Sequence, residues 1–327
     1  MARGNGTRDP RAHPVGQNRS AIVLAGGDGT RLRELTRQIA GDDRPKQFCP
    51  LLGEKTLLGE TRGRVALAVP PSRTFFSVTA SHARYYAPLL ADVRSRQVVA
   101  QPVNRGTAPA ILYALLRVAA VTPSAPVAIF PSDHHVSDDE DFMAHVHAAF
   151  DLVDARPDLV TLLGITPDRP ETEYGWIEPA QPIVGPRGRP FYGVRRFWEK
   201  PASELAQALL ADGCLWNSFV MVGLGATLLG LIERTLRDLF SAFLPVRRWM
   251  GTPMEAAVAD AVYRTFPASD FSRGVLGAIA PRLAVLPVRG VAWSDLGRPE
   301  RVLAIGSPMA MPRPAVAAPR SVVAAAG

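Results

Sequence analysis

The sequence is poor in cysteine, with only Cys49 and Cys214 among its 327 residues and no CxxC pair. Neither a disulfide framework nor a zinc site is therefore expected. An apolar signal segment is missing near the N-terminus, and the most membrane-like stretch, 219–232, is too short to cross a bilayer. These absences predict a cytoplasmic protein with no membrane partner.

Basic runs interleaved with aromatic residues are also missing, although the net charge is +7. Residues 1–20 carry four arginines and one aspartate, and residues 307–327 carry two arginines and no acidic residue. Five of the seven positive charges thus lie in the two end segments. Because the rest of the chain is nearly balanced, we expect no nucleic-acid partner.

Residues 1–19 and 307–327 lack hydrophobic periodicity, and both segments are predicted to be flexible tails. Residues 20–306 are predicted to form a single catalytic domain. Short apolar runs that predict strands alternate there with amphipathic stretches that predict helices. The strands are expected at 21–24, 75–79, 97–100, 127–130, 159–164 and 218–223, and the helices at 56–69, 83–94, 107–121, 140–155 and 202–212. Thr107 is expected to cap the helix at 107–121.

This alternation predicts an α/β fold with a mainly parallel sheet and helices on both faces. Ligands of such sheets bind at the carboxyl ends of the strands. The loops that follow Leu24, Ala100 and Phe130 are therefore the expected functional loops.

The loop after the first strand reads Ala-Gly-Gly-Asp-Gly-Thr-Arg-Leu over residues 25–32. It matches neither GxxxxGK[ST] nor GxGxxG, which argues against a P-loop ATPase and an NAD-dependent dehydrogenase. Its glycines let backbone N–H groups approach an anion, and the helix expected to follow would add partial positive charge. Arg31 adds a guanidinium group, and Lys46 follows Pro45 in a second motif, at 44–48.

Together these motifs resemble the AGGxGTRL and PK motifs of the sugar nucleotidyltransferases, and within that family the mannose-1-phosphate guanylyltransferases most of all. Further matching segments occur in the same order along the chain, at 101–110, 130–136, 166–177, 197–201, 215–218 and 293–297. The resemblance implies a Rossmann-like mixed sheet. It also implies attack by a sugar-1-phosphate, mannose-1-phosphate in the first instance, on the α-phosphorus of an NTP, in the first instance GTP.

The resemblance also implies a role for particular residues. Arg31 and Lys46 would be catalytic, binding the β/γ-phosphates and the α-phosphate, and Asp133 and Asp295 would hold Mg²⁺. The nucleotide would contact Leu24, Ala25, Gly26, Gly27, Gly29, Thr30, Gln101, Gly106 and Thr107. The sugar phosphate would contact Tyr174, Gly175, Glu199, Lys200 and Asn217.

The chain departs from the family pattern at residues 245–275, which lack the acidic, aromatic pattern of close relatives, and at two places in the expected site. Residues 104–107 read Asn-Arg-Gly-Thr where guanylyltransferases more often have Gly-Arg-Asn-Thr, and Phe219 stands where glycine is usual. Another NTP, another hexose-1-phosphate or a catalytically silent regulatory relative therefore stay open, and a homo-oligomer is compatible with the sequence. Asp133-His134-His135 also matches the DHH phosphoesterases, but their other acidic motifs are not evident, so both histidines are expected to be ordinary loop residues.

Overall fold

The computed structural model describes residues 18–306. Most of the predicted N-terminal tail and all of the predicted C-terminal tail lie outside these residues. Arg19, which we assigned to the tail, belongs to the folded body. Its guanidinium group is buried, lies 3.0 Å from the carboxylate of Asp151 and is stacked over the ring of Phe150.

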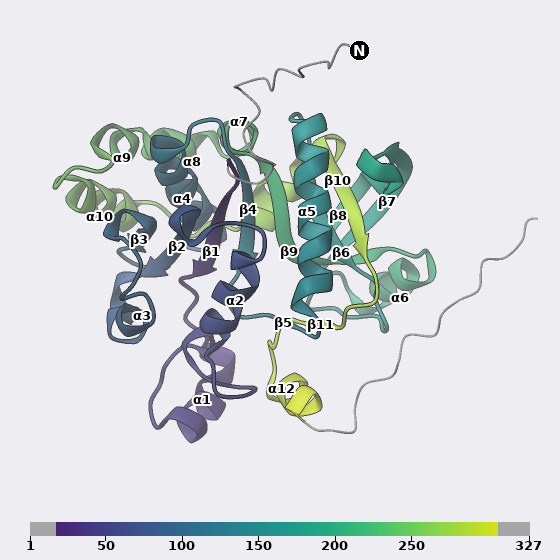
Figure 1. Ribbon diagram of the computed structural model, residues 1–327, viewed down its shortest axis with the longest axis horizontal. Coiled ribbons are helices and arrows are strands. Elements are labelled where there is room, and N and C mark those ends of the chain that lie inside the picture. The colour runs from purple at the N-terminus through teal and green to yellow at the C-terminus, as the bar shows by residue number, and fades with distance from the viewer. Residues whose placement is uncertain (1–17, 307–327) are drawn as a thin grey trace, which may run out of the picture.

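A nine-stranded sheet crosses the whole molecule, in the order β3-β2-β1-β4-β9-β6-β10-β8-β7 (Figure 1). Its strands are β1 (Ser20–Ala25), β2 (Thr74–Thr79), β3 (Val98–Gln101), β4 (Pro126–Pro131), β6 (Val160–Ile165), β7 (Gly175–Val184), β8 (Pro190–Glu199), β9 (Leu215–Leu224) and β10 (Leu283–Val288). A two-stranded sheet pairs β5 (His135–Val136) with β11 (Trp293–Ser294). This small pairing brings the segment that holds Asp295 beside the segment that holds Asp133.

The sheet has two halves of different character. Strands β3, β2, β1 and β4 are parallel, as are β6 and β10. Strand β9 runs antiparallel between β4 and β6, and β7 and β8 form a long antiparallel hairpin. The prediction of an α/β fold with a mixed, Rossmann-like sheet is confirmed, and its parallel part is concentrated in the N-terminal half.

Helices cover both faces of the sheet. They are α1 (Arg33–Ala40), α2 (Leu57–Ala66), α3 (Ala83–Leu89), α4 (Thr107–Val121), α5 (Asp139–Ala155), α6 (Ser203–Ala211), α7 (Gly225–Thr235), α8 (Arg237–Ala242), α9 (Leu244–Trp249), α10 (Glu255–Thr265), α11 (Phe271–Gly274) and α12 (Pro299–Gly306). One core packs α4, α7, α8, α10 and α11 on one face, and the other packs α2, α5 and α6 on the opposite face. Helix α5 crosses in front of the sheet in Figure 1.

Three local predictions were wrong. Helix α3 ends at Leu89 rather than at residue 94, one residue after the proline inside it. Gly106, not Thr107, is the N-cap of α4, because the Thr107 hydroxyl bonds α11 instead. The glycine loop leads first into a short 3-10 turn, Thr30–Leu32, so α1 begins only at Arg33.

Candidate functional site

A cleft of about 400 Å³ opens where the loops after β1, β3 and β4 meet. Most predicted site residues line it: Leu24, Gly26, Gly27, Arg31, Gln101, Gly106, Thr107, Asp133, Tyr174, Gly175, Glu199, Lys200, Asn217 and Asp295. Ala25, Gly29, Thr30 and Lys46 are not among the residues that line the cleft, although they belong to the two motifs that border it. The loops after Leu24, Ala100 and Phe130, which we expected to be the functional ones, thus border one cleft.

The three glycines of the first loop have different roles. Gly29 has φ +59°, and a Cβ there would lie 2.9 Å from the backbone nitrogen of Lys46. Gly26 lies so close to Gln101 that a Cβ would approach its Nε2 to 2.7 Å. No atom lies within 4 Å of a Cβ at Gly27. Gly29 and Gly26 therefore pack the loop against its neighbours, whereas Gly27 leaves room for a ligand.

Gln47 fixes the same loop, which the sequence did not reveal. Its buried side-chain amide donates to the carbonyl oxygens of Ala25, at 3.1 Å, and Gly27, at 2.7 Å. Two backbone carbonyls are thereby turned toward Gln47. The loop is preorganised by a residue that is not among those lining the cleft.

Lys46 joins three distant segments. Its ammonium group donates to the carbonyl oxygens of Asp295, at 2.5 Å, and Leu296, at 3.3 Å, and lies 3.3 Å from Asp133 Oδ2. The side chain is only 10% exposed. Arg31, in contrast, is 63% exposed and lies 3.9 Å from Glu173. The site thus combines a buried, fixed cation with an exposed one.

Asp295 is oriented by three donors on one oxygen. Its Oδ1 accepts from the Tyr174 hydroxyl at 3.0 Å, from Arg301 Nη1 at 2.5 Å and from the Gly297 backbone N–H at 2.8 Å. Burial would raise the pKa of Asp295, but the positive environment of His134, Arg301 and Lys46 outweighs burial and lowers this pKa below its usual value. Asp295 is therefore held as a carboxylate with its orientation fixed.

The two aspartates that the resemblance implies as Mg²⁺ ligands both line the cleft. Among residues 18–306, no three His, Cys, Asp or Glu side chains form a metal-binding group. Mg²⁺ is commonly held by one or two carboxylates together with phosphate oxygens and water, and Asp133 and Asp295 offer donors of that type. His134 lies in a loop, as expected, and lines the cleft with its Nε2 3.6 Å from Asp133, whereas His135, also expected in a loop, belongs to β5.

The loop after β3 is held by protein contacts rather than left free. Gln101 is 2% exposed and bonds Ser77 and Tyr263 through its amide. Gly106 has φ +88°, and a Cβ there would come within 2.4 Å of the Ser269 carbonyl oxygen. Gln101 thus bonds β2 and α10, and Gly106 packs against the segment before α11; Asp270 of that segment and Ser272 of α11 also line the cleft. Any contact of Gln101 with a nucleobase must therefore be made while its amide stays bonded to Ser77 and Tyr263.

The predicted sugar half is assembled at the start of the β7–β8 hairpin and on β9. A Cβ at Gly175 would lie 3.1 Å from Glu199 Oε2 and 3.4 Å from the Cβ of Asn217. Lys200 lies 3.6 Å from Glu199. Burial raises the pKa of Glu199, and Asp270 raises it further against the opposing effect of Lys200. Polar groups suited to sugar hydroxyls thus gather at one end of the cleft.

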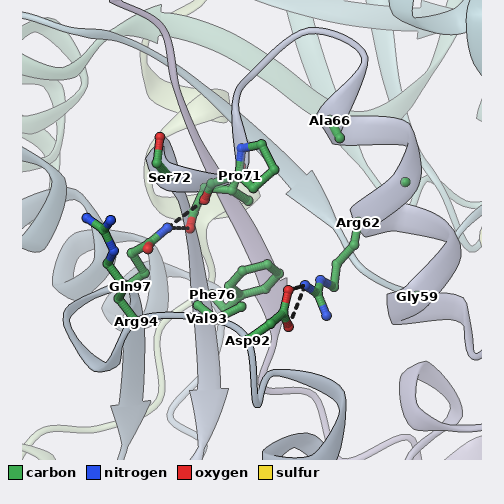
Figure 2. A pocket seen from close by; sticks show the side chains of 12 residues that line it. Gly59, Arg62, Ala66, Pro71, Ser72, Phe76, Asp92, Val93, Arg94 and Gln97 are labelled. Atoms are coloured by element: carbon green, nitrogen blue, oxygen red, sulfur yellow. Dashed lines mark hydrogen bonds and ion pairs between the residues drawn. The ribbon is translucent and has the colours of Figure 1, made fainter.

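A second cavity, of about 480 Å³, lies between α2 and the β2–β3 edge (Figure 2). Arg62 and Asp92 form an ion pair of 2.6 Å inside it, and the Gln97 amide donates to the carbonyl oxygens of Pro71 and Thr74, both at 2.7 Å. These polar groups bond one another, and the signature motifs lie elsewhere. The smaller cleft is therefore the better candidate for the site.

No helix in the described part of the chain is long and apolar enough to span a membrane. A family model described as "Nucleotidyl transferase" matches residues 20–308. This match covers the glycine loop, Lys46 and both aspartates.

Several named proteins are similar to the chain. A mannose-1-phosphate guanylyltransferase from Sinorhizobium fredii is 32% identical over 290 residues, covering 84% of this chain and 52% of that protein. ManC from Salmonella typhimurium, described by the same activity, is 30% identical, covering 84% and 57%. The chain thus spans little more than half the length of these relatives.

A solved structure from Thermus thermophilus, described as a mannose-1-phosphate geranyltransferase, has a TM-score of 0.73 and 33% identity. This match covers 88% of this chain and 79% of that one. A solved structure from Helicobacter pylori, described as a mannose-6-phosphate isomerase, shares the fold with a TM-score of 0.66 at 19% identity, covering 85% and 100%.

Proposed function

The chain belongs to the nucleotidyl transferase family, and we propose that it joins GTP and mannose-1-phosphate to give GDP-mannose and pyrophosphate. The observation that carries the proposal is the position of Lys46. This buried cation lies between Asp133 and the backbone of Asp295, beside a glycine loop that leaves room for a ligand at Gly27. The names of similar proteins support the choice of base and sugar.

The triphosphate binds along the glycine loop, with Arg31 on the β- and γ-phosphates and Lys46 at the α-phosphate. A phosphate oxygen of mannose-1-phosphate attacks the α-phosphorus in line, forming a new P–O bond. The bond between the α-phosphorus and its bridging oxygen to the β-phosphate breaks, and pyrophosphate leaves with the electron pair. Because charge accumulates on phosphate oxygens during this step, preorganised cations supply most of the catalysis.

Asp133 and Asp295 would hold Mg²⁺, which neutralises phosphate charge when bound. The protein's own contribution is orientation. Three donors fix Oδ1 of Asp295, so the carboxylate does not have to reorganise when substrates arrive. Lys46 is fixed in the same way by two carbonyl oxygens.

On the sugar side, Glu199 and Asn217 accept or donate hydrogen bonds to hydroxyl groups, and Lys200 binds the sugar phosphate. Glycine at 175 keeps this end of the cleft open, because a Cβ there would lie 2.9 Å from Cζ of Phe197 and 3.1 Å from Glu199 Oε2. Both cysteines are buried and free, which supports the reducing cytoplasm as the place where the protein works.

Pyrophosphate release, measured over a panel of four NTPs and several hexose-1-phosphates with Mg²⁺, tests the proposal. We expect the highest kcat/KM for GTP with mannose-1-phosphate. If turnover is highest with a different pair, the proposed reaction type stands and the proposed substrates are wrong. Absence of turnover with every pair, in protein shown to be folded, would reject the proposal.

A further inference from the structure

Strand β9 carries a bulge where it passes the cleft. Leu162 of β6 pairs with Met221 of β9, and Gly164 pairs with Asn217. Between these two pairs β6 has one residue whereas β9 has three, so β9 bulges. Phe219 lies within this bulge with φ +59°. Glycine is the usual residue at such a backbone conformation, and a bulky side chain there is a genuine outlier.

Side chains of the neighbouring residues hold the bulge. The buried Ser218 hydroxyl donates to the Leu163 carbonyl oxygen at 2.6 Å and accepts from the Val220 N–H at 3.1 Å. The Phe219 N–H donates to Asn217 Oδ1 at 3.0 Å. None of these bonds uses the Phe219 side chain. The left-handed backbone is therefore built independently of the ring that it carries.

All three described non-glycine residues with positive φ lie at the site: Lys200, Phe219 and Leu296. Lys200 lines the cleft, and the carbonyl of Leu296 accepts from Lys46. Backbone strain of this kind persists where the surrounding structure enforces it, and it concentrates at functional sites. Phe219 lies at the cleft as the other two strained residues do, so we expect its side chain to contact a ligand there.

The ring of Phe219 is half-buried. It packs against the hydrophobic core that includes α4 and α7, and Phe219 belongs to the wall of the cleft together with Asn217 and Glu199. An apolar, rigid surface near hydroxyl-binding groups matches a pyranose, which has polar edges and apolar C–H faces. A phenyl ring at this position also occupies volume that a glycine would leave empty.

We propose that Phe219 is a specificity-determining residue for the sugar phosphate. Its ring packs on a C–H face of the hexose and excludes hexose-1-phosphates that carry a bulky acylamino substituent. The inference rests on the proposed function, which it deepens by naming the substrate class: unsubstituted hexose-1-phosphates. Asn217 and Glu199 recognise hydroxyl groups, and Phe219 sets the space beside them.

The test compares Phe219→Gly and Phe219→Ala with wild type by calorimetry, using mannose-1-phosphate and N-acetylglucosamine-1-phosphate as probes. The affinity of both variants for mannose-1-phosphate should fall about tenfold or more, as expected when an apolar contact is lost. The ratio of the affinity for mannose-1-phosphate to the affinity for N-acetylglucosamine-1-phosphate should fall by a similar factor. Affinity for GTP should stay within about twofold, since the triphosphate loop is unchanged. Trp249→Ala, which removes an exposed ring on α9, should leave all three affinities unchanged.

The two variants distinguish the effect of losing the phenyl ring from the effect of relieving backbone strain. Phe219→Gly relieves the left-handed strain and should fold at least as stably as Phe219→Ala, which keeps it. If either folded variant retains the wild-type preference between the two sugars, the inference is wrong. Turnover by wild type tests the proposed function separately, and failure of wild type to bind any hexose-1-phosphate would reject both.

Discussion

Lys46 is one of only three lysines in a chain that holds 37 basic residues, and Lys200 at the cleft is another. Its ammonium group has three acceptors around it: two backbone carbonyls and the Asp133 carboxylate. An ammonium ion has three donors, so the environment matches lysine and does not match the planar fork of arginine. This match explains why arginine, so common elsewhere in the chain, is not found here.

We predict that Lys46→Ala lowers kcat about 10²–10³-fold, because a preorganised cation at the reacting phosphate is lost. Lys46→Arg should lose activity as well. Steady-state pyrophosphate release measures both. Lys55→Ala removes the exposed third lysine and serves as the matched control, with kcat expected to stay near wild type. Near-normal kcat in Lys46→Ala would contradict the assigned role.

Replacing Glu199 with glutamine should affect the stability of the protein and its binding of the sugar phosphate in opposite directions. Burial raises its pKa, with Asp270 acting in the same direction and Lys200 and Arg273 against it. Because the folded-state pKa lies above the unfolded value, ionisation of Glu199 destabilises the native state as pH rises through that interval. Glu199→Gln should therefore be at least as stable as wild type at neutral pH while losing affinity for the sugar phosphate.

Thermal unfolding of Glu199→Gln and wild type across pH measures this effect. The gain in Tm of the variant should shrink as pH falls below the ordinary range of a carboxyl group, where Glu199 is protonated in both states. A Tm difference that does not change with pH would show that Glu199 is not the group responsible.

The residues that the sequence missed act through partners distant in the chain. Gln47 and Ser218 bond backbone carbonyls, and their functions depend on which strand or loop lies beside them. The cleft position of His134 arises from the pairing of β5 with β11. Motifs in a sequence identify groups that carry chemistry, whereas the groups that position them become visible only when distant segments are brought together.

At the scale of the element, the glycine loop offers two substitutions with contrasting outcomes. In Gly29→Ala, the new Cβ meets the Lys46 backbone nitrogen at 2.9 Å and requires a positive φ, so we predict a loss of about 1–3 kcal/mol in stability. In Gly27→Ala, the Cβ enters open space, so stability should hold while KM for the NTP rises. Denaturant unfolding and steady-state kinetics measure the pair. Equal stability losses would contradict the packing role of Gly29.

Helix α12 is attached to the site by Arg301. This side chain is 11% exposed and bonds Asp295, Glu171 and Glu173. Because its loss removes the counter-charge that Asp295, Glu171 and Glu173 share, and Asp295 is buried, Arg301→Ala should cost several kcal/mol in stability. The neighbouring Arg298, 55% exposed and paired with Glu173, is the matched control and should cost about 1 kcal/mol or less. Comparable losses in the two variants would exclude a special role for Arg301.

Predictions of elements succeeded where the hydrophobic pattern is strong. The buried strands β1 and β4 and the helix α4 lie where their apolar runs placed them. The β7–β8 hairpin was not predicted, because prolines and charged residues interrupt the alternation in both strands. Its pairing depends on contacts across the sheet rather than on local pattern.

At the scale of the whole molecule, the two proposed substrate sites lie on different parts of the sheet. Parallel strands β1, β3 and β4 carry the loops assigned to the nucleotide, whereas β7, β8 and β9 carry the residues assigned to the sugar. Strand β9 joins the halves, and its bulge lies where they meet. Reaction between the two substrates is therefore expected at this junction, close to Lys46 and both aspartates.

The most direct test of nucleotidyl transfer at this junction follows oxygen atoms through one reaction. The protein is incubated with Mg²⁺, unlabelled GTP and mannose-1-phosphate that carries ¹⁸O in its phosphate group, and the products are analysed by mass spectrometry. Attack of the sugar phosphate on the α-phosphorus predicts GDP-mannose that retains all of the label, together with unlabelled pyrophosphate. Label in pyrophosphate, or no nucleotide sugar from folded protein, would contradict the account.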